Sequence, residues 1–154
     1  MKSKAAIRGG EFLIREVTID EVFIPEEFDE EQLMIAESCN DFVETEIAPH
    51  FDDLDDHTEG LMALLLKKAG ELGLLGLSVP EDLDGFGQSF LTSMKANEAI
   101  GSAYSFSVAF MAHTGIGTLP ILYYGNDEQH QKYVPGLATG EKLAAYCLTE
   151  PNAG

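Results

Sequence analysis

Apolar residues recur every three or four positions along most of the chain, which is the period of an amphipathic helix. The first run of this kind places apolar side chains at Ile35, Cys39, Phe42, Val43 and Ile47. Asp29 precedes this run and Gln32 follows three positions later, a pattern typical of a capped helix start. Pro49 is expected to end this first helix.

The same period, with its start and stop signals, predicts further helices downstream. They are expected over residues 58–72, 89–100, 102–114, 119–124 and 126–138. Thr58 is the expected cap of the second helix and Gly73 its stop, while Gly115 and Gly117 are expected to break the chain after residue 114. Residues 102–114 are apolar on most sides, which predicts a buried helix. The stretch 74–87 is rich in Gly and Pro and is expected to form a long loop.

One apolar run, Leu143–Thr149, has the length of a strand and is bounded by turn residues. A single strand is not stable alone, and the sequence stops at Gly154 inside a Pro- and Gly-containing turn. We therefore expect a fragment with an all-α fold of about six helices, ending in the first strand of a truncated β domain. The expected parts are a partly mobile lead-in (1–25), a helical domain (26–140) and the start of the β domain (141–154).

The 154 residues carry a formal net charge of -18. This charge argues against binding to nucleic acid or to anionic lipid, because both need a basic surface. The sequence holds no run of 18 or more apolar residues, so no membrane-spanning helix is expected. Cys39 and Cys147 cannot form a disulfide framework, and we expect free thiols in a reducing, cytoplasmic compartment.

The negative charge is concentrated in residues 1–60, which hold 18 acidic and 4 basic side chains. The simplest interpretation is a solvated face that favours solubility, and a docking surface for a basic partner is the alternative. The acidic stretch His50–His57 lacks the spacing and the glycine of an EF-hand loop, so no metal site is expected there.

Without comparison to a known family, the motifs in this sequence indicate no particular reaction. No two of the four histidines form an H-x-x-x-H pair, and His113 is expected to be a hydrogen-bonded core residue rather than a ligand. The G-x-G pairs at 85–87 and 115–117 lack the third glycine of a dinucleotide fingerprint. These residues alone predict an acidic helical domain.

The C-terminal segment 145–154, AYCLTEPNAG, closely resembles the flavin-contacting signature of the acyl-CoA dehydrogenase family. Three upstream stretches resemble the same family in the same order, at 73–87, 97–101 and 124–137. The resemblance therefore extends over residues 28–154. The lead-in stretches Gly9–Leu13 and Phe23–Glu26 resemble the very-long-chain subgroup.

The resemblance implies a larger enzyme with an N-terminal helical domain, a middle β domain and a C-terminal helical domain. The implied reaction oxidises a fatty acyl-CoA to trans-2-enoyl-CoA in fatty-acid β-oxidation, with FAD as hydride acceptor and an electron-transfer flavoprotein as partner. The family's glutamate base belongs to the C-terminal domain. No catalytic residue is therefore expected here, Glu150 included, and the fragment alone is expected to be inactive. The resemblance also implies a homo-oligomer.

The resemblance assigns flavin contacts to Tyr146, Leu148 and Thr149, through backbone groups and the Thr149 hydroxyl, and a close approach to the flavin at Gly154. It assigns the wall of the acyl-chain cavity to Val108, Ala109, Ala112 and Ile116. These are small or medium apolar residues, which suits a long acyl chain. The alternative for Thr149 is an ordinary hydroxyl at a strand end, and the alternative for Tyr146 and Leu148 is that they are core residues of the strand. Gly154 could simply be a turn glycine, and the four wall residues could simply pack helices together.

A second class of function also stays open at this point. The chain could be a short, non-catalytic helical module that binds a protein or an acyl group through its acidic face or an apolar groove. Either kind of protein would expose an apolar patch.

Overall fold

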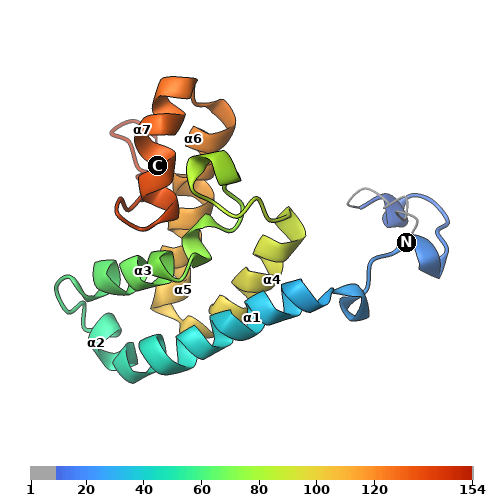
Figure 1. Ribbon diagram of the computed structural model, residues 1–154, viewed down its shortest axis with the longest axis horizontal. Coiled ribbons are helices and arrows are strands. Elements are labelled where there is room, and N and C mark those ends of the chain that lie inside the picture. Colours follow the sequence, from blue (N-terminus) through green and yellow to red (C-terminus); the bar gives the residue numbers. More distant parts are fainter. Residues whose placement is uncertain (1–9, 154) are drawn as a thin grey trace.

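The computed structural model describes residues 10–153, which are mainly helical and contain no strand within that range (Figure 1). The α-helices are α1 (Glu30–Phe42), α2 (Phe51–Asp55), α3 (Leu61–Glu71), α4 (Phe90–Ile100), α5 (Ser105–Met111), α6 (Leu119–Tyr124) and α7 (Asp127–Ala138). Short 3-10 and π turns connect some of these helices directly, so the described residues form five continuous helical rods rather than about six separate helices.

Both capped helix starts are confirmed. The backbone N–H of Gln32 donates to the Asp29 carboxylate at 2.8 Å, and the Asp29 N–H donates to the Gln32 side chain at 3.1 Å. Asn126 and Gln129 make the same reciprocal pair at the start of α7, with both distances 2.9 Å. Each pair satisfies backbone N–H groups that a helix start otherwise leaves without partners.

Two predicted boundaries of the first helices are wrong. Pro49 does not end the first helix, because a π turn (Val43–Ile47) and a 3-10 turn (Ala48–His50) continue the rod into α2. Proline is tolerated there since it lies in the first turn of a new segment. Thr58 does not cap α3, which starts instead after Gly60 at φ 78°. Gly73, at φ 79°, follows the end of α3 as predicted.

The predicted break at Gly115 and Gly117 is also wrong. A π turn (Ala112–Gly117) joins α5 to α6, so that Ser105–Tyr124 forms one helix of 20 residues. The Thr118 hydroxyl and N–H both donate to the His113 carbonyl oxygen, at 2.7 and 3.0 Å, where the turn closes. By length and mean hydropathy this helix could cross a membrane, although core helices of globular proteins pass the same test. The expected absence of a membrane span is therefore not supported by length alone.

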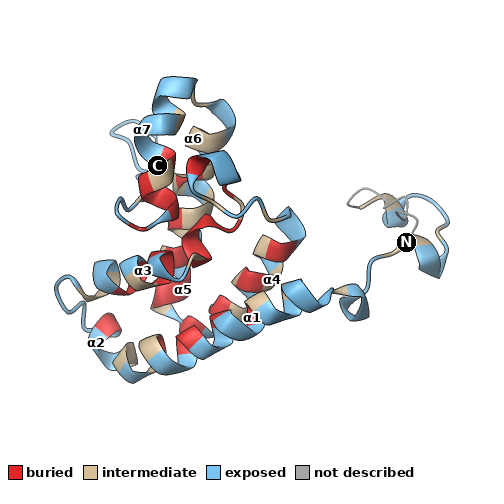
Figure 2. Ribbon diagram, in the orientation of Figure 1, coloured by how far each residue is buried: buried red, intermediate tan, exposed pale blue. Residues whose placement is uncertain are grey.

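Two apolar clusters hold the rods together, and they lie on the inner faces of the helices in Figure 2. In the larger cluster α1 packs against α4, and the Phe106 ring lies 5.9 Å from the Phe42 ring and 6.2 Å from the Phe110 ring. The smaller cluster joins α7 to the loop that follows α3 through Val79, Leu83, Val134 and Ala138.

The two ends of the described chain lie outside these clusters. Residues 10–28 run away from the bundle through short 3-10 turns (Figure 1), and Phe28 contacts α4 through Lys95, whose ammonium lies 5.0 Å from the ring centroid. Residues 1–9 of the predicted mobile lead-in fall outside the described residues, and mobility of the rest stays a prediction. The predicted strand over 143–149 is not formed, because nothing in the described range offers it a ladder partner.

Candidate functional site

The helix Ser105–Tyr124 has one buried face and one exposed apolar face. Phe106 and Phe110 are fully buried, whereas Val108 is 69% exposed and Ile116 is 47% exposed. The prediction of a helix buried on all sides is therefore wrong. Single exposed apolar side chains are common on protein surfaces, whereas several that share one face form a patch that can mark a binding surface.

The four residues predicted to line the acyl-chain cavity do not all lie on the same face of this helix. Val108, Ala112 and Ile116 follow one another at intervals of four residues, and all three are exposed or half-buried. Ala109 is also partly exposed but packs against the larger core cluster. The three residues at the four-residue spacing therefore define the candidate surface, which we call the wall face.

A separate pocket of about 150 Å³ lies beside the same helix, toward α4. It is lined mainly by apolar side chains that include Phe90, Met94, Met111, Leu119 and Tyr123. It contains none of the four predicted wall residues. The sequence could not indicate this pocket, because periodicity within one helix does not show which other helix packs beside it.

The segment Leu143–Thr149 is extended and mostly exposed, with Tyr146 at 53% and Leu148 at 68%. Within the described residues, the backbone N–H groups of Tyr146, Leu148 and Thr149 donate to no protein acceptor, and the Thr149 hydroxyl has no partner. Backbone N–H groups are obligatory donors, so an extended edge of this kind is able to receive an acceptor from outside the chain. Gly154 lies outside the described residues.

Ala144 joins this extended segment to the wall face. Its backbone N–H donates to Nδ1 of His113 at 3.0 Å, and its methyl group lies directly against Gly117. Both partners belong to the π turn Ala112–Gly117, which also carries two residues of the wall face. The structure therefore brings the predicted acyl wall and the predicted flavin-contacting segment together at one point.

His113 is fully buried and is a hydrogen-bonded core residue, as predicted. Its Nε2 lies 3.0 Å from the Leu137 carbonyl oxygen, and its Nδ1 accepts from Ala144. Because Nδ1 accepts, the neutral ring carries its proton on Nε2 and donates it to Leu137. Burial lowers the pKa of His113 below its usual 6.5, which favours this neutral form.

This lowered pKa makes the stability of the chain depend on pH. The unfolded chain binds a proton at pH values where the folded His113 does not, so the stabilisation is complete above pH 6.5 and is lost as the pH falls through the lowered pKa. The free energy of unfolding of wild type minus that of His113→Asn is therefore expected to decrease on acidification below pH 6.5. Urea unfolding of both proteins across this range measures it, and a pH-independent difference would contradict it.

Among the described residues, Cys39 is the other buried titratable group whose pKa is shifted. Burial raises the pKa of the Cys39 thiol to about 11, which keeps it protonated and unreactive at neutral pH. Among the described residues, no three His, Cys, Asp or Glu side chains are grouped so that they could hold a metal ion.

The chain belongs to the acyl-CoA dehydrogenase family: residues 29–141 match the family described as "Acyl-CoA dehydrogenase, N-terminal domain". It is similar to a probable acyl-CoA dehydrogenase of Bacillus subtilis, with 49% identity over 156 residues that cover 100% of this chain and 26% of that protein. A second Bacillus subtilis protein, an acyl-CoA dehydrogenase, is 40% identical over 126 residues, which cover 81% of this chain and 33% of the relative.

The fold is likewise similar to a crystal structure of an acyl-CoA dehydrogenase complexed with FAD from Bacillus anthracis. The TM-score is 0.91 with 50% sequence identity, and the match covers 97% of this chain and 26% of that chain. The chain thus spans about a quarter to a third of the length of these relatives. Their names specify no acyl chain length, so the resemblance to the very-long-chain subgroup stays a prediction.

Proposed function

We propose that the chain supplies the N-terminal helical domain of an FAD-dependent acyl-CoA dehydrogenase, which oxidises a long-chain fatty acyl-CoA to trans-2-enoyl-CoA in β-oxidation. The observation that carries this proposal is the joint at Ala144, where the exposed wall face meets the extended segment. An acyl chain and a flavin have to lie beside each other for hydride transfer, and this chain offers an apolar surface and a donor-rich edge side by side.

The extended segment suits a flavin because of its unused donors. Tyr146, Leu148 and Thr149 are exposed residues, and the N–H groups of Tyr146 and Leu148 and the hydroxyl of Thr149 are the groups able to bond the polar edge of the ring. Bound FAD would supply the hydride acceptor for the reaction. Donors already held in an extended edge stabilise negative charge on a bound ring without further reorganisation.

The wall face suits the hydrocarbon tail of the substrate. Val108, Ala112 and Ile116 carry no polar side-chain atoms, and each methylene buried against such a surface contributes about 0.8 kcal/mol. Ala112 lies between the two larger residues and leaves space at the centre of the face. This space supports the assignment of a long acyl chain.

The glutamate base, the remaining cofactor contacts and the contacts of the homo-oligomer are assigned to regions beyond the quarter to third of the relatives that this chain spans. On this proposal the chain alone does not oxidise acyl-CoA. The proposal further includes an electron-transfer flavoprotein as electron acceptor, which is supported by the residues that resemble the family. It also includes a cytoplasmic location, which is supported by the free thiols of Cys39 and Cys147.

A chimera tests the proposed function directly. This chain would replace the matching region of the 49% identical Bacillus subtilis relative. We expect a folded protein with visible flavin absorbance that reduces an artificial electron acceptor when acyl-CoA is added. A folded, flavin-loaded chimera that oxidises no acyl-CoA of any length, while the parent relative does, would overturn the proposal.

Substituting Ala112 in this chimera tests the wall face. Ala112→Phe is expected to lower kcat/KM for long-chain acyl-CoA by about tenfold relative to short-chain acyl-CoA, because the ring fills space meant for the tail. Ala63→Phe is the matched control, since Ala63 is exposed on α3. Equal losses for long and short substrates in Ala112→Phe would contradict the assignment.

A further inference from the structure

The π turn Ala112–Gly117 interrupts the helix Ser105–Tyr124, which we call the wall helix because it carries the wall face. Ala144, which lies 31 positions after His113, contacts this turn. His113 and Ala144 make the only hydrogen bond between the described parts of this helix and the extended segment. A π turn inside an α-helix is rare and occurs often at functional positions. The widened turn therefore needs an explanation beyond packing.

The two ring nitrogens of His113 bond two different elements. Nδ1 accepts from Ala144 at the start of the extended segment, and Nε2 donates to Leu137 at the end of α7. An ordinary core-filling side chain would need neither bond. The ring thus links the wall helix, α7 and the extended segment, and it uses one specific tautomer to do so.

Gly117 also allows Ala144 to lie against the π turn. A Cβ at this position would lie 2.5 Å from the Ala144 methyl group, closer than any side chain tolerates. The two hydrogen bonds from Thr118 to the His113 carbonyl hold the turn in the form that presents both residues. The position of Ala144 is therefore determined both by a hydrogen bond and by a steric fit.

We propose that His113 is a positioning residue. In its neutral form, protonated on Nε2, it fixes the position of Ala144 and thereby the direction in which residues 145–149 extend away from the wall helix. The effect of this anchor, the hydrogen bond from Ala144 to His113, on flavin geometry rests on the proposed function. The anchor itself does not depend on that function. His113 touches neither cofactor nor substrate in this assignment and acts only through Ala144.

Two variants separate the two bonds of the ring. In His113→Asn the side-chain oxygen takes about the place of Nδ1 and can accept from Ala144, while the bond to Leu137 is lost. In His113→Gln the amide nitrogen takes about the place of Nε2 and can donate to Leu137, while the bond to Ala144 is lost. Each variant removes one hydrogen bond of similar strength, so their general destabilisation is matched.

The readout is amide hydrogen exchange of Ala144 in the 154-residue chain. We expect exchange about tenfold faster in His113→Gln than in wild type, and within about threefold of wild type in His113→Asn. The Gly73 amide, which bonds to Gly70 within the bundle, is the internal control for folding in all three proteins. Equal acceleration of Ala144 in both variants, or in neither, would overturn the proposal.

A measurement on the wild type alone keeps the proposal testable if a variant fails to fold. Nitrogen-15 spectra of the His113 ring are expected to show an unprotonated Nδ1 and a protonated Nε2 at neutral pH. A protonated Nδ1 could not accept from Ala144 and would refute the anchor. Neither experiment involves flavin or acyl-CoA, so failure of the anchor and failure of the proposed function are separate results.

Discussion

Replacing Phe106 by alanine is expected to lower the free energy of unfolding by about 3–5 kcal/mol, the largest effect of any single substitution considered. Phe106 is fully buried, and its ring lies between those of Phe42 in α1 and Phe110 in α5. Its removal leaves a cavity where two rods meet, and backbone rods relax into such a space only in part. Urea unfolding followed by circular dichroism measures the loss.

The matched control is Phe90→Ala, because Phe90 is 65% exposed at the start of α4. We expect a change of less than about 1 kcal/mol for this substitution. A domain of ordinary stability has about 5–15 kcal/mol to lose, so Phe106→Ala removes a large share of it. Similar losses for the two variants would show that Phe106 does not occupy the centre of the core.

Replacing Gly70 by alanine is expected to lower the free energy of unfolding by about 3 kcal/mol. Alanine is normally preferred to glycine in a helix, by about 1 kcal/mol, so the expected sign is the reverse of the helix propensity. A Cβ on Gly70 would lie 2.3 Å from the Thr139 carbonyl oxygen and 2.7 Å from the Gly140 nitrogen. Both are backbone atoms, which cannot rotate away as a side chain would.

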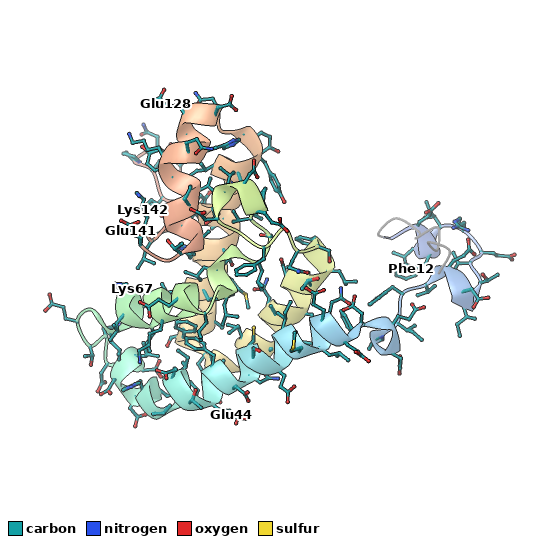
Figure 3. All side chains as sticks on the ribbon, in the orientation of Figure 1. Phe12, Glu44, Lys67, Glu128, Glu141 and Lys142 are labelled. Atoms are coloured by element: carbon teal, nitrogen blue, oxygen red, sulfur yellow. The ribbon has the colours of Figure 1, made fainter. Side chains whose placement is uncertain are left out.

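This contact holds α3 against the turn that follows α7. Figure 3 labels Glu141 and Lys142 next to that turn and Lys67 on α3. A Cβ built on Gly140 would lie 3.2 Å from the Cα atom of Lys67. Displacing the turn would also shift the start of the extended segment. The substitution therefore tests how α3 packs on the turn after α7, as well as a single steric contact.

Gly101→Ala is the control for Gly70→Ala. Gly101 follows α4 at φ −55°, and an added Cβ meets nothing within 4 Å. Alanine is expected to leave stability unchanged or raise it by up to about 1 kcal/mol, since it restricts the unfolded chain. Thermal or urea unfolding that ranks the two variants in the opposite order would contradict the packing of α3 on this turn.

Local signals in the sequence predicted local features well. The helix starts at Asp29 and Asn126 and the end of α3 before Gly73 depend on groups within four residues of each other. The break at Gly115 and Gly117 was predicted by the same kind of rule and is wrong. The propensity of a glycine to end a helix was outweighed by hydrogen bonds from Thr118 and by the close approach of Ala144.

The resemblance to the family supplied the candidate site, and the structure changed how its parts relate. The sequence placed four residues on one wall, but Ala109 packs partly on the core, while Val108, Ala112 and Ile116 share the exposed face. His113 was predicted as a hydrogen-bonded core histidine, but the sequence did not indicate its partners. Its two backbone partners lie 24 and 31 positions away, a distance that no local pattern can indicate.

The sequence by itself determined the helical class, the capped helix starts and the family, because these depend on neighbouring residues or on a short signature. Only the tertiary structure decided which faces stay exposed, that α5 and α6 form one helix, and that Ala144 meets His113. These features depend on which rods pack together, and packing free energy between distant segments exceeds the fraction of a kcal/mol that a local propensity contributes.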